Sequence, residues 1–170
     1  LRAQHPDLRL ILVPRHPDRS ANICDLLAAA KLGCQLRSDE KQLSDDRPVL
    51  VANKLGELRA LYGLCHIAFI GGTLVDHGGH NPLEAAAWGA AMLAGPSQRN
   101  FDLIFEALES SGAMQRVERS SASLVLAFST LLEDRTLCRS MGEAARGYLQ
   151  LNRGATEANL ALFQLRLRKR

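Results

Sequence analysis

The sequence lacks the features that define several broad classes of protein. No apolar run approaches the roughly 20 residues that a membrane-spanning helix requires, and no signal-peptide pattern is visible. The 21 Lys and Arg nearly balance the 18 Asp and Glu, and a net charge of +3 does not call for a nucleic-acid partner. Neither a Gly-x-Gly-x-x-Gly fingerprint nor a Walker-type Gly-Lys-Ser/Thr occurs, which argues against the usual dinucleotide-binding and P-loop proteins.

Metal and disulfide signals are weak as well. No two of the four cysteines form a Cys-x-x-Cys pair, and their spacing does not match that of zinc ligands. The cysteines are Cys24, Cys34, Cys65 and Cys138. Each stands in an apolar context, which is typical of buried free thiols in a reducing compartment. Asp76, His77 and His80 are only loosely spaced and no further Asp/His cluster accompanies them, so we expect no metal site.

The chain of 170 residues, 46% of them hydrophobic, is long enough for one domain with an ordinary core. It begins at Leu1 without an initiator Met and runs straight into a strand-like segment, so we expect a fragment or excised domain of a longer protein. A break at Asn152-Arg153-Gly154 suggests that residues 1–150 form the domain and that residues 151–170 form a C-terminal helix.

Short apolar runs alternate with stretches of helical periodicity along the chain. The expected strands cover residues 8–13, 33–37, 48–52, 67–70, 90–94 and 114–117. Helical spacing fills the intervals between most of them, and from Ser120 onward the pattern is helical only. Because the strands are apolar runs rather than strict alternations, we predict an α/β fold in which helices cover both faces of a doubly wound parallel sheet.

The end of the chain is basic, with Arg166, Arg168, Lys169 and Arg170. Cations are favourable in the last turn of a helix, so we favour a solvated helix end over the alternative of a contact with a membrane surface.

Several loops bring polar groups to one edge of the predicted sheet. In open α/β sheets, ligands bind beyond the carboxyl ends of the strands. Glycines, cations or amides follow four of the expected strands: Arg15 and His16, Asn53 and Lys54, Gly71 to Thr73 with Gly78 to Asn81, and Gly95 to Gln98. This convergence predicts a ligand site at that edge.

The segment Gly78-Gly79-His80-Asn81-Pro82-Leu83-Glu84 carries the most specific signal. Asn81 is a good N-cap, proline suits the first helical position, and Glu84 stands where a capping box places its acid. Capping alone would explain Asn81 and Glu84, but not the two glycines and His80 before them. Glycines let backbone N–H groups approach a ligand closely, and a helix start attracts anions, so this segment predicts a phosphate cradle.

A second candidate is the loop Pro14-Arg15-His16-Pro17. The prolines stiffen the loop, so Arg15 and His16 would be displayed with little conformational entropy left to lose. The guanidinium fork of Arg15 matches phosphate oxygens. The alternative is a surface arginine beside a histidine that bonds to backbone.

The same residues resemble the C-terminal half of the bacterial Kdo transferases, the 3-deoxy-D-manno-octulosonic acid transferases of lipopolysaccharide synthesis. The resemblance covers residues 8–117 and includes the Pro-Arg-His segment, Gly56-Glu57-Leu58, Ala68 to Leu74, the Gly78 to Glu84 string, Gly95-Pro96 and Asn100-Phe101. The chain departs from the family's usual runs at Asn53-Lys54-Leu55 and at Ser97-Gln98-Arg99.

The resemblance implies the Rossmann-like C-terminal half of a GT-B glycosyltransferase that moves Kdo from CMP-Kdo to a lipid A precursor, with no metal or cofactor. An absent N-terminal domain would bind the acceptor, carry a membrane anchor and supply the catalytic base. The full-length protein would act at the cytoplasmic face of the bacterial inner membrane, and this fragment would be soluble, would not interact with nucleic acid and would bind donor without turnover. Rival hypotheses are another GT-B nucleotide-sugar enzyme, a UDP-sugar transferase or epimerase, and a non-catalytic nucleotide-binding module.

The resemblance also implies roles for individual residues. Arg15 and His16 would meet the CMP moiety, with Arg15 nearest the phosphate. The floor of the site would consist of Gly71, Gly72 and Thr73.

Gly79, His80 and Asn81 would hold the phosphate at the helix start. Glu84 would reach the ribose hydroxyls. No catalytic residue is expected within the chain itself.

Overall fold

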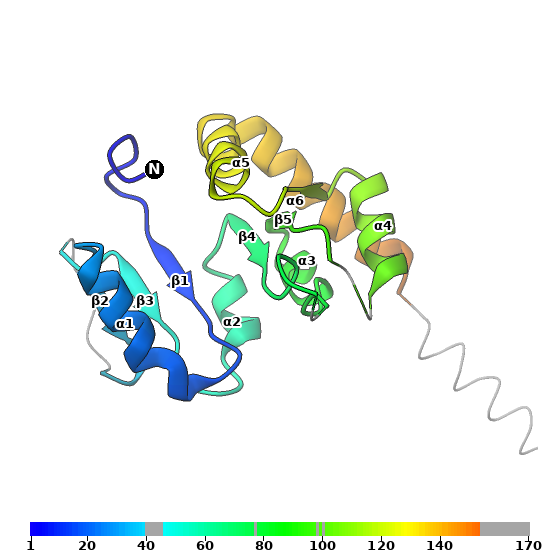
Figure 1. The fold of residues 1–170 in the computed structure, drawn as a ribbon. Helices are drawn as coiled ribbons and strands as arrows, with labels where there is room; N and C mark the ends of the chain where they lie inside the picture. The colour runs from blue at the N-terminus through cyan, green and yellow to red at the C-terminus, as the bar shows by residue number, and fades with distance from the viewer. Residues whose placement is uncertain (40–45, 77, 98, 100, 154–170) are drawn as a thin grey trace, which may run out of the picture. The chain divides into compact units, whose positions relative to one another are not determined.

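The computed structural model describes residues 1–39, 46–76, 78–97, 99 and 101–153. Parallel strands alternate with helices along the chain, as the sequence predicts (Figure 1). The chain divides into two compact units, Leu1–Leu64 and Cys65–Arg170. The sequence suggests one sheet, whereas the hydrogen-bonded ladders of the described residues form two three-stranded sheets, one in each unit.

The sheet of the first unit has the strand order β1-β3-β2, with all pairs parallel. Its strands are β1 (Leu10–Leu12), β2 (Cys34–Leu36) and β3 (Val49–Val51). Val49 on the central strand pairs with Leu10 on one side and with Cys34 on the other. All three residues of β3 are buried, which explains why this strand is an unbroken apolar run rather than an alternation.

The described residues of the first unit also form α-helices and short 3-10 turns: η1 (Pro17–Arg19), α1 (Ser20–Ala29), η2 (Arg37–Asp39) and α2 (Leu58–Tyr62). Helix α1 packs against β2 and β3. Leu50, Ala52 and Leu61 form the buried core of the unit, with Ile11 packed against them. The helix α2 therefore contributes its Leu61 to the same core as the central strand.

The second unit repeats the parallel arrangement in the order β4-β5-β6. Its strands are β4 (Ile67–Ile70), β5 (Ala91–Ala94) and β6 (Met114–Arg116). The central strand β5 is buried at every residue. Its two alanines and the Met and Leu between them therefore fit a position that is covered on both faces.

In the part of this unit that the structure describes, helices accompany the sheet: α3 (Leu83–Trp88), α4 (Asp102–Ser110), α5 (Ser121–Glu133) and α6 (Arg135–Leu151). The starts of α5 and α6 carry side-chain caps, because Ser120 Oγ accepts from Ser123 N–H at 3.1 Å and Asp134 Oδ1 accepts from Leu137 N–H at 2.8 Å. Buried side chains of β5, α5 and α6 pack into one apolar cluster, with Leu93, Leu131 and Met141 among its members.

All six strands fall within the segments expected from the sequence, and the expected helices between and after them are present. Helix α6 ends at Leu151, and Asn152 forms its C-cap; the predicted division into residues 1–150 and 151–170 stays a prediction. The predicted helix beyond the break lies outside the described residues, which end at residue 153. Among the helices that are described, none has both the length and the apolar content to cross a bilayer.

Helices α3 and α6 meet through glycines. A Cβ on Gly142 of α6 would lie 2.2 Å from the carbonyl oxygen of Gly89, so the helix can approach the end of α3 only because no side chain intervenes. Gly89 ends α3 in the left-handed region, with φ of 69°. The Arg146 guanidinium donates to the Trp88 carbonyl at 2.7 Å and so satisfies a free carbonyl at that helix end.

Because of this close approach, we expect replacement by alanine to have opposite effects on stability at two glycines of α6. Gly142→Ala should lower the free energy of unfolding by about 2 kcal/mol or more, because the added methyl group meets fixed backbone. Gly147→Ala is the matched control, since a Cβ there meets nothing within 4 Å, and it should raise stability by about 0.5–1 kcal/mol through helix propensity. Denaturant unfolding of the two variants measures both; equal effects would contradict the assigned packing.

Candidate functional site

The glycine-rich loop after β4 turns back on itself where its glycines require it. Gly72 has φ of 80°, and a Cβ there would lie 2.5 Å from the carbonyl oxygen of Gly78. Only glycine combines this backbone conformation with so close a contact. The His80 N–H donates to the Gly71 carbonyl at 3.0 Å, so the end of the loop returns to its beginning.

Thr73 ties this loop to the neighbouring strand. Its side chain is fully buried, and its hydroxyl donates to the Ile70 carbonyl at 2.6 Å and accepts from the Gly95 N–H at 2.8 Å. Its carbonyl accepts from Ser97 N–H at 2.9 Å. Thr73 therefore joins the carboxyl ends of β4 and β5 through its backbone and hydroxyl bonds.

Two further glycines make this packing possible. A Cβ on Gly95 would lie 2.4 Å from the Thr73 carbonyl oxygen. A Cβ on Gly79 would lie 2.7 Å from both Phe105 Cζ and Thr73 Cγ2. Because Phe105 is itself fully buried, it cannot move aside freely. The sequence analysis did not predict that Phe105 supports the loop, because this contact joins segments that are distant in sequence.

Asn81 bonds to the first turn of α3 as the sequence predicts, although the helix begins at Leu83 with Pro82 at the N-cap position, one residue later than expected. Asn81 Oδ1 accepts from the Leu83 N–H at 3.0 Å, which satisfies one of the free donors of the first turn. Pro82 is fully buried at this start. Glu84 lies half-buried in the first turn. The imidazole of His80 lies beside Gly71, where a Cβ would be 3.2 Å from His80 Cδ2.

An ion pair between Asp76 and Arg119 links the outer part of the loop to the segment before α5. Both side chains are largely exposed, so we assign the pair an orienting role rather than a large share of stability. Neighbouring charges also pair: Arg116 Nε donates to Glu109 Oε2 at 2.8 Å. Neither pair could be predicted from the sequence: Asp76 and Arg119 are 43 residues apart, Glu109 and Arg116 are seven residues apart in different elements, and such residue types are common at surfaces.

The first unit also gathers polar groups at the carboxyl ends of its strands. Arg15 and His16 follow β1 and are exposed, as the stiff proline-framed loop predicts. The His16 carbonyl accepts from the Arg19 N–H at 3.1 Å as the chain enters η1. Asn53, which follows β3, exchanges two hydrogen bonds with Ser38, which follows β2.

The structure thus places the predicted site residues in two groups. Gly71, Gly72, Thr73, Gly79, His80, Asn81 and Glu84 lie together in the second unit around the ends of β4 and β5. Arg15 and His16 lie in the first unit. That this pair faces the glycine-rich loop stays a prediction.

Two partly buried thiols of the second unit, Cys65 and Cys138, lie near the amino end of β4, where Cys138 Sγ contacts the His66 carbonyl at 3.6 Å. Burial raises the pKa of Cys65 and of Cys138, so these thiols hold their protons at neutral pH. The four cysteines are free, and they are half-buried rather than buried as expected from their apolar contexts. Within the described residues no group of three or more His, Cys, Asp or Glu side chains could hold a metal ion; His77 lies outside them.

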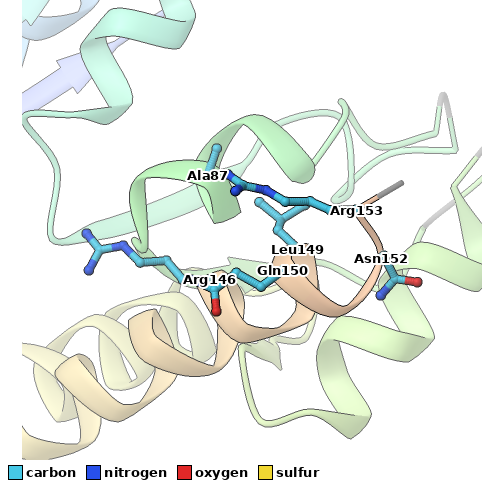
Figure 2. A pocket seen from close by; sticks show the side chains of 6 residues that line it. All are labelled: Ala87, Arg146, Leu149, Gln150, Asn152 and Arg153. Carbon is cyan, nitrogen blue, oxygen red and sulfur yellow. The ribbon is translucent and has the colours of Figure 1, made fainter. Parts of the chain in front are cut away.

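A cavity of about 320 Å³ lies between α3 and the end of α6 (Figure 2). Its lining comprises Ala87, Arg146, Leu149, Gln150, Asn152 and Arg153. Ala87 comes from the last turns of α3, whereas Asn81 stands at the opposite end of that helix. The cavity shares no residue with the predicted ligand site, so the cavity and the predicted site are separate features.

Comparison with known proteins identifies Kdo transferases among the relatives. No family model matches the chain. The 3-deoxy-D-manno-octulosonic acid transferase of Haemophilus influenzae is 37% identical over 164 residues, which are 96% of this chain and 38% of the relative. The transferase of the same name from Bordetella pertussis is 32% identical over 160 residues, 94% of this chain and 37% of the relative. The chain belongs to the Kdo transferase family.

Solved structures agree with this membership. The crystal structure of the C-terminal CMP-Kdo binding domain of WaaA from Acinetobacter baumannii matches with a TM-score of 0.81 and 26% identity, over 88% of this chain and 77% of that one. Sucrose-phosphate synthase from Thermosynechococcus elongatus matches in fold alone, with a TM-score of 0.59 and 18% identity over 98% of this chain and 47% of that one. The predicted α/β fold, the C-terminal half of a GT-B glycosyltransferase, is confirmed.

The chain spans about 38% of the length of its Haemophilus influenzae relative. The glycine-rich loop and the capped start of α3 lie within the matched part, because the match covers 96% of the chain.

The hydroxyl of Thr73 offers a direct test of how the loop is held. Thr73→Val keeps the side-chain shape but leaves the buried Gly95 N–H without its acceptor, which should lower the free energy of unfolding by about 2 kcal/mol. Thr130→Val is the control, because the Thr130 hydroxyl bonds to the Leu126 carbonyl on an exposed helix face, and its effect should stay within about 0.5 kcal/mol. Thermal unfolding of both variants measures the two effects. A Thr73→Val variant as stable as the control would refute the role assigned to the Thr73 hydroxyl.

Proposed function

We propose that this chain is the donor-binding domain of a glycosyltransferase that transfers Kdo from CMP-Kdo to a lipid A precursor in lipopolysaccharide biosynthesis. The proposal rests chiefly on the match, over 88% of the chain, to a domain described as binding CMP-Kdo. Identity of 37% to a transferase over almost the whole chain supports it independently. By the bounds predicted from sequence, residues 1–150 form this domain.

The glycine-rich loop is the proposed phosphate site. Gly79 packs closely against its neighbours because it has no side chain, and Asn81 caps the helix that follows. Backbone N–H groups at this turn can therefore reach a bound anion. We assign Gly79, His80 and Asn81 to the phosphate of CMP. We assign Gly71 and Gly72 to the floor beneath it, where their lack of side chains lets the loop fold back on itself.

Thr73 belongs to the same floor and holds it in place through its buried hydroxyl. We assign Glu84 to the ribose hydroxyls, since a carboxylate accepts hydrogen bonds from a vicinal diol. Its position in the first turn of α3 places it directly after the capped helix start.

Arg15 and His16 are the proposed contribution of the first unit. Both side chains are exposed on a loop between two prolines, so they can bind a ligand at little cost in conformational entropy. The Arg15 guanidinium suits two phosphate oxygens at once. We assign Arg15 to the phosphate of CMP and His16 to the rest of the nucleotide.

These assignments explain how the domain would promote transfer. The bond between the anomeric carbon of the sugar and the CMP phosphate breaks as negative charge grows on the departing phosphate. Donors fixed at Arg15 and at the start of α3 would stabilise that charge more in the transition state than in the ground state. They accelerate the reaction by helping the leaving group depart.

The remaining functions belong to the proposed N-terminal domain of the whole protein. It would supply the base that deprotonates the acceptor hydroxyl, bind the lipid A precursor and attach the enzyme to the cytoplasmic face of the inner membrane. The chain described here would then bind CMP-Kdo without transferring the sugar.

Titration of the chain with CMP tests the donor site. Arg15→Ala and Asn81→Ala should each weaken CMP binding by about tenfold or more, because each removes a group placed at a charged phosphate. Asn81→Ala should also lower the free energy of unfolding by about 1 kcal/mol through the lost cap.

Matched variants separate binding from folding. Arg19→Ala removes an exposed arginine one turn further along the chain and should leave CMP affinity unchanged. Asn81→Ser keeps a capping oxygen and should restore stability while CMP binding remains weak. If both alanine variants bind CMP with unchanged affinity, the proposed site is wrong. A preference of the chain for UDP over CMP would indicate a different nucleotide-sugar enzyme.

A further inference from the structure

The two parts of the glycine-rich loop are held by different kinds of contact. At its base, the buried Thr73 hydroxyl bonds to the Ile70 carbonyl and the Gly95 N–H. Three residues later, the side chain of Asp76 is 72% exposed, and its Oδ1 pairs with Nη2 of Arg119. Buried hydrogen bonds therefore fix the base of the loop, whereas an ion pair at the surface ties its outer part to the segment between β6 and α5.

The backbone that carries Arg119 is bonded both to the sheet and to α5. The Val117 N–H donates to the Ala94 carbonyl at 2.8 Å, which extends the ladder between β5 and β6. The Glu118 N–H donates to Ser123 Oγ in the first turn of α5 at 3.0 Å. Because these bonds restrain the chain just before Arg119, its guanidinium extends toward the loop from a fixed base.

The position of Asp76 is coupled to the turn that the proposed phosphate site uses. Gly78 follows two residues later, and two residues of chain span at most about 7 Å. Gly78 has φ of 82°, and a Cβ on Gly72 would lie 2.5 Å from its carbonyl oxygen, so this turn packs tightly on the start of the loop. A displacement of Asp76 therefore reaches Gly78 and the N–H groups of the residues that follow.

We propose that Arg119 is a positioning residue for the nucleotide phosphate. Its ion pair with Asp76 holds the outer part of the loop, so that the N–H groups of Gly79 and His80 are aligned before the ligand binds. A loop that is already ordered loses less conformational entropy on binding. The inference rests on the proposed function, because it requires that the loop receives the phosphate.

Positioning can be distinguished from a simple effect of charge. If Asp76 and Arg119 acted on the phosphate only through their charges, loss of the arginine would weaken binding and loss of the carboxylate would strengthen it. If the pair holds the loop, loss of either partner weakens binding. Because exposed ion pairs contribute little energy, we expect a change of about two- to fivefold in affinity.

Calorimetric titration of the whole chain with CMP tests this role. Arg119→Gln and Asp76→Asn should each weaken CMP binding by about two- to fivefold. The double variant should lose no more affinity than either single variant, since both substitutions break the same contact. Arg139→Gln is the control, because it removes an exposed arginine of α6 in the same unit, and it should bind CMP as the unmodified chain does.

Exchange of the two charges provides the rescue. A chain with both Asp76→Arg and Arg119→Asp should recover most of the lost affinity, and all variants should melt within about 2 °C of the unmodified chain because the pair is exposed. If the chain binds CMP but Arg119→Gln binds it as tightly as the control, or if Asp76→Asn binds it more tightly, the positioning role is wrong while the proposed function stands. If the unmodified chain does not bind CMP, both fail.

Discussion

The buried hydroxyl of Thr73 is the interaction on which the candidate site depends. It bonds at once to the Ile70 carbonyl and the Gly95 N–H, and so joins the ends of two parallel strands beneath the glycine-rich loop. In a fully buried position neither bond can be replaced by water, so the geometry of the loop is fixed by the fold rather than by the ligand. A phosphate-binding loop that is already ordered loses less conformational entropy when it binds.

The glycines around Thr73 follow from the same constraint. Gly72, Gly79 and Gly95 each lie where a Cβ would collide with the loop or its supports. Their absence of side chains is therefore first a condition of folding and, in the proposed function, also a condition of binding. The fold and the proposed site thus restrict the same positions, and damage to one is expected to appear in the other.

Much of this arrangement could be predicted from sequence because its signals are local. The apolar run of β5 requires a strand buried on both faces, and the Asn81 cap depends on residues two apart in the chain. The support from Thr73 and Phe105 could not be predicted, because those contacts join segments that only the tertiary structure brings together.

The central claim is that the loop between β4 and α3 receives the phosphate of a cytidine nucleotide. An assigned amide NMR spectrum of the isotope-labelled chain, recorded during titration with CMP, tests this most directly. The largest saturable changes in amide chemical shift are expected at Gly71, Gly72, Gly79, His80 and Asn81. The amides of Arg15 and His16 should shift over the same range of CMP concentration. Shifts confined to α5 and α6, or none at saturating CMP, would contradict it.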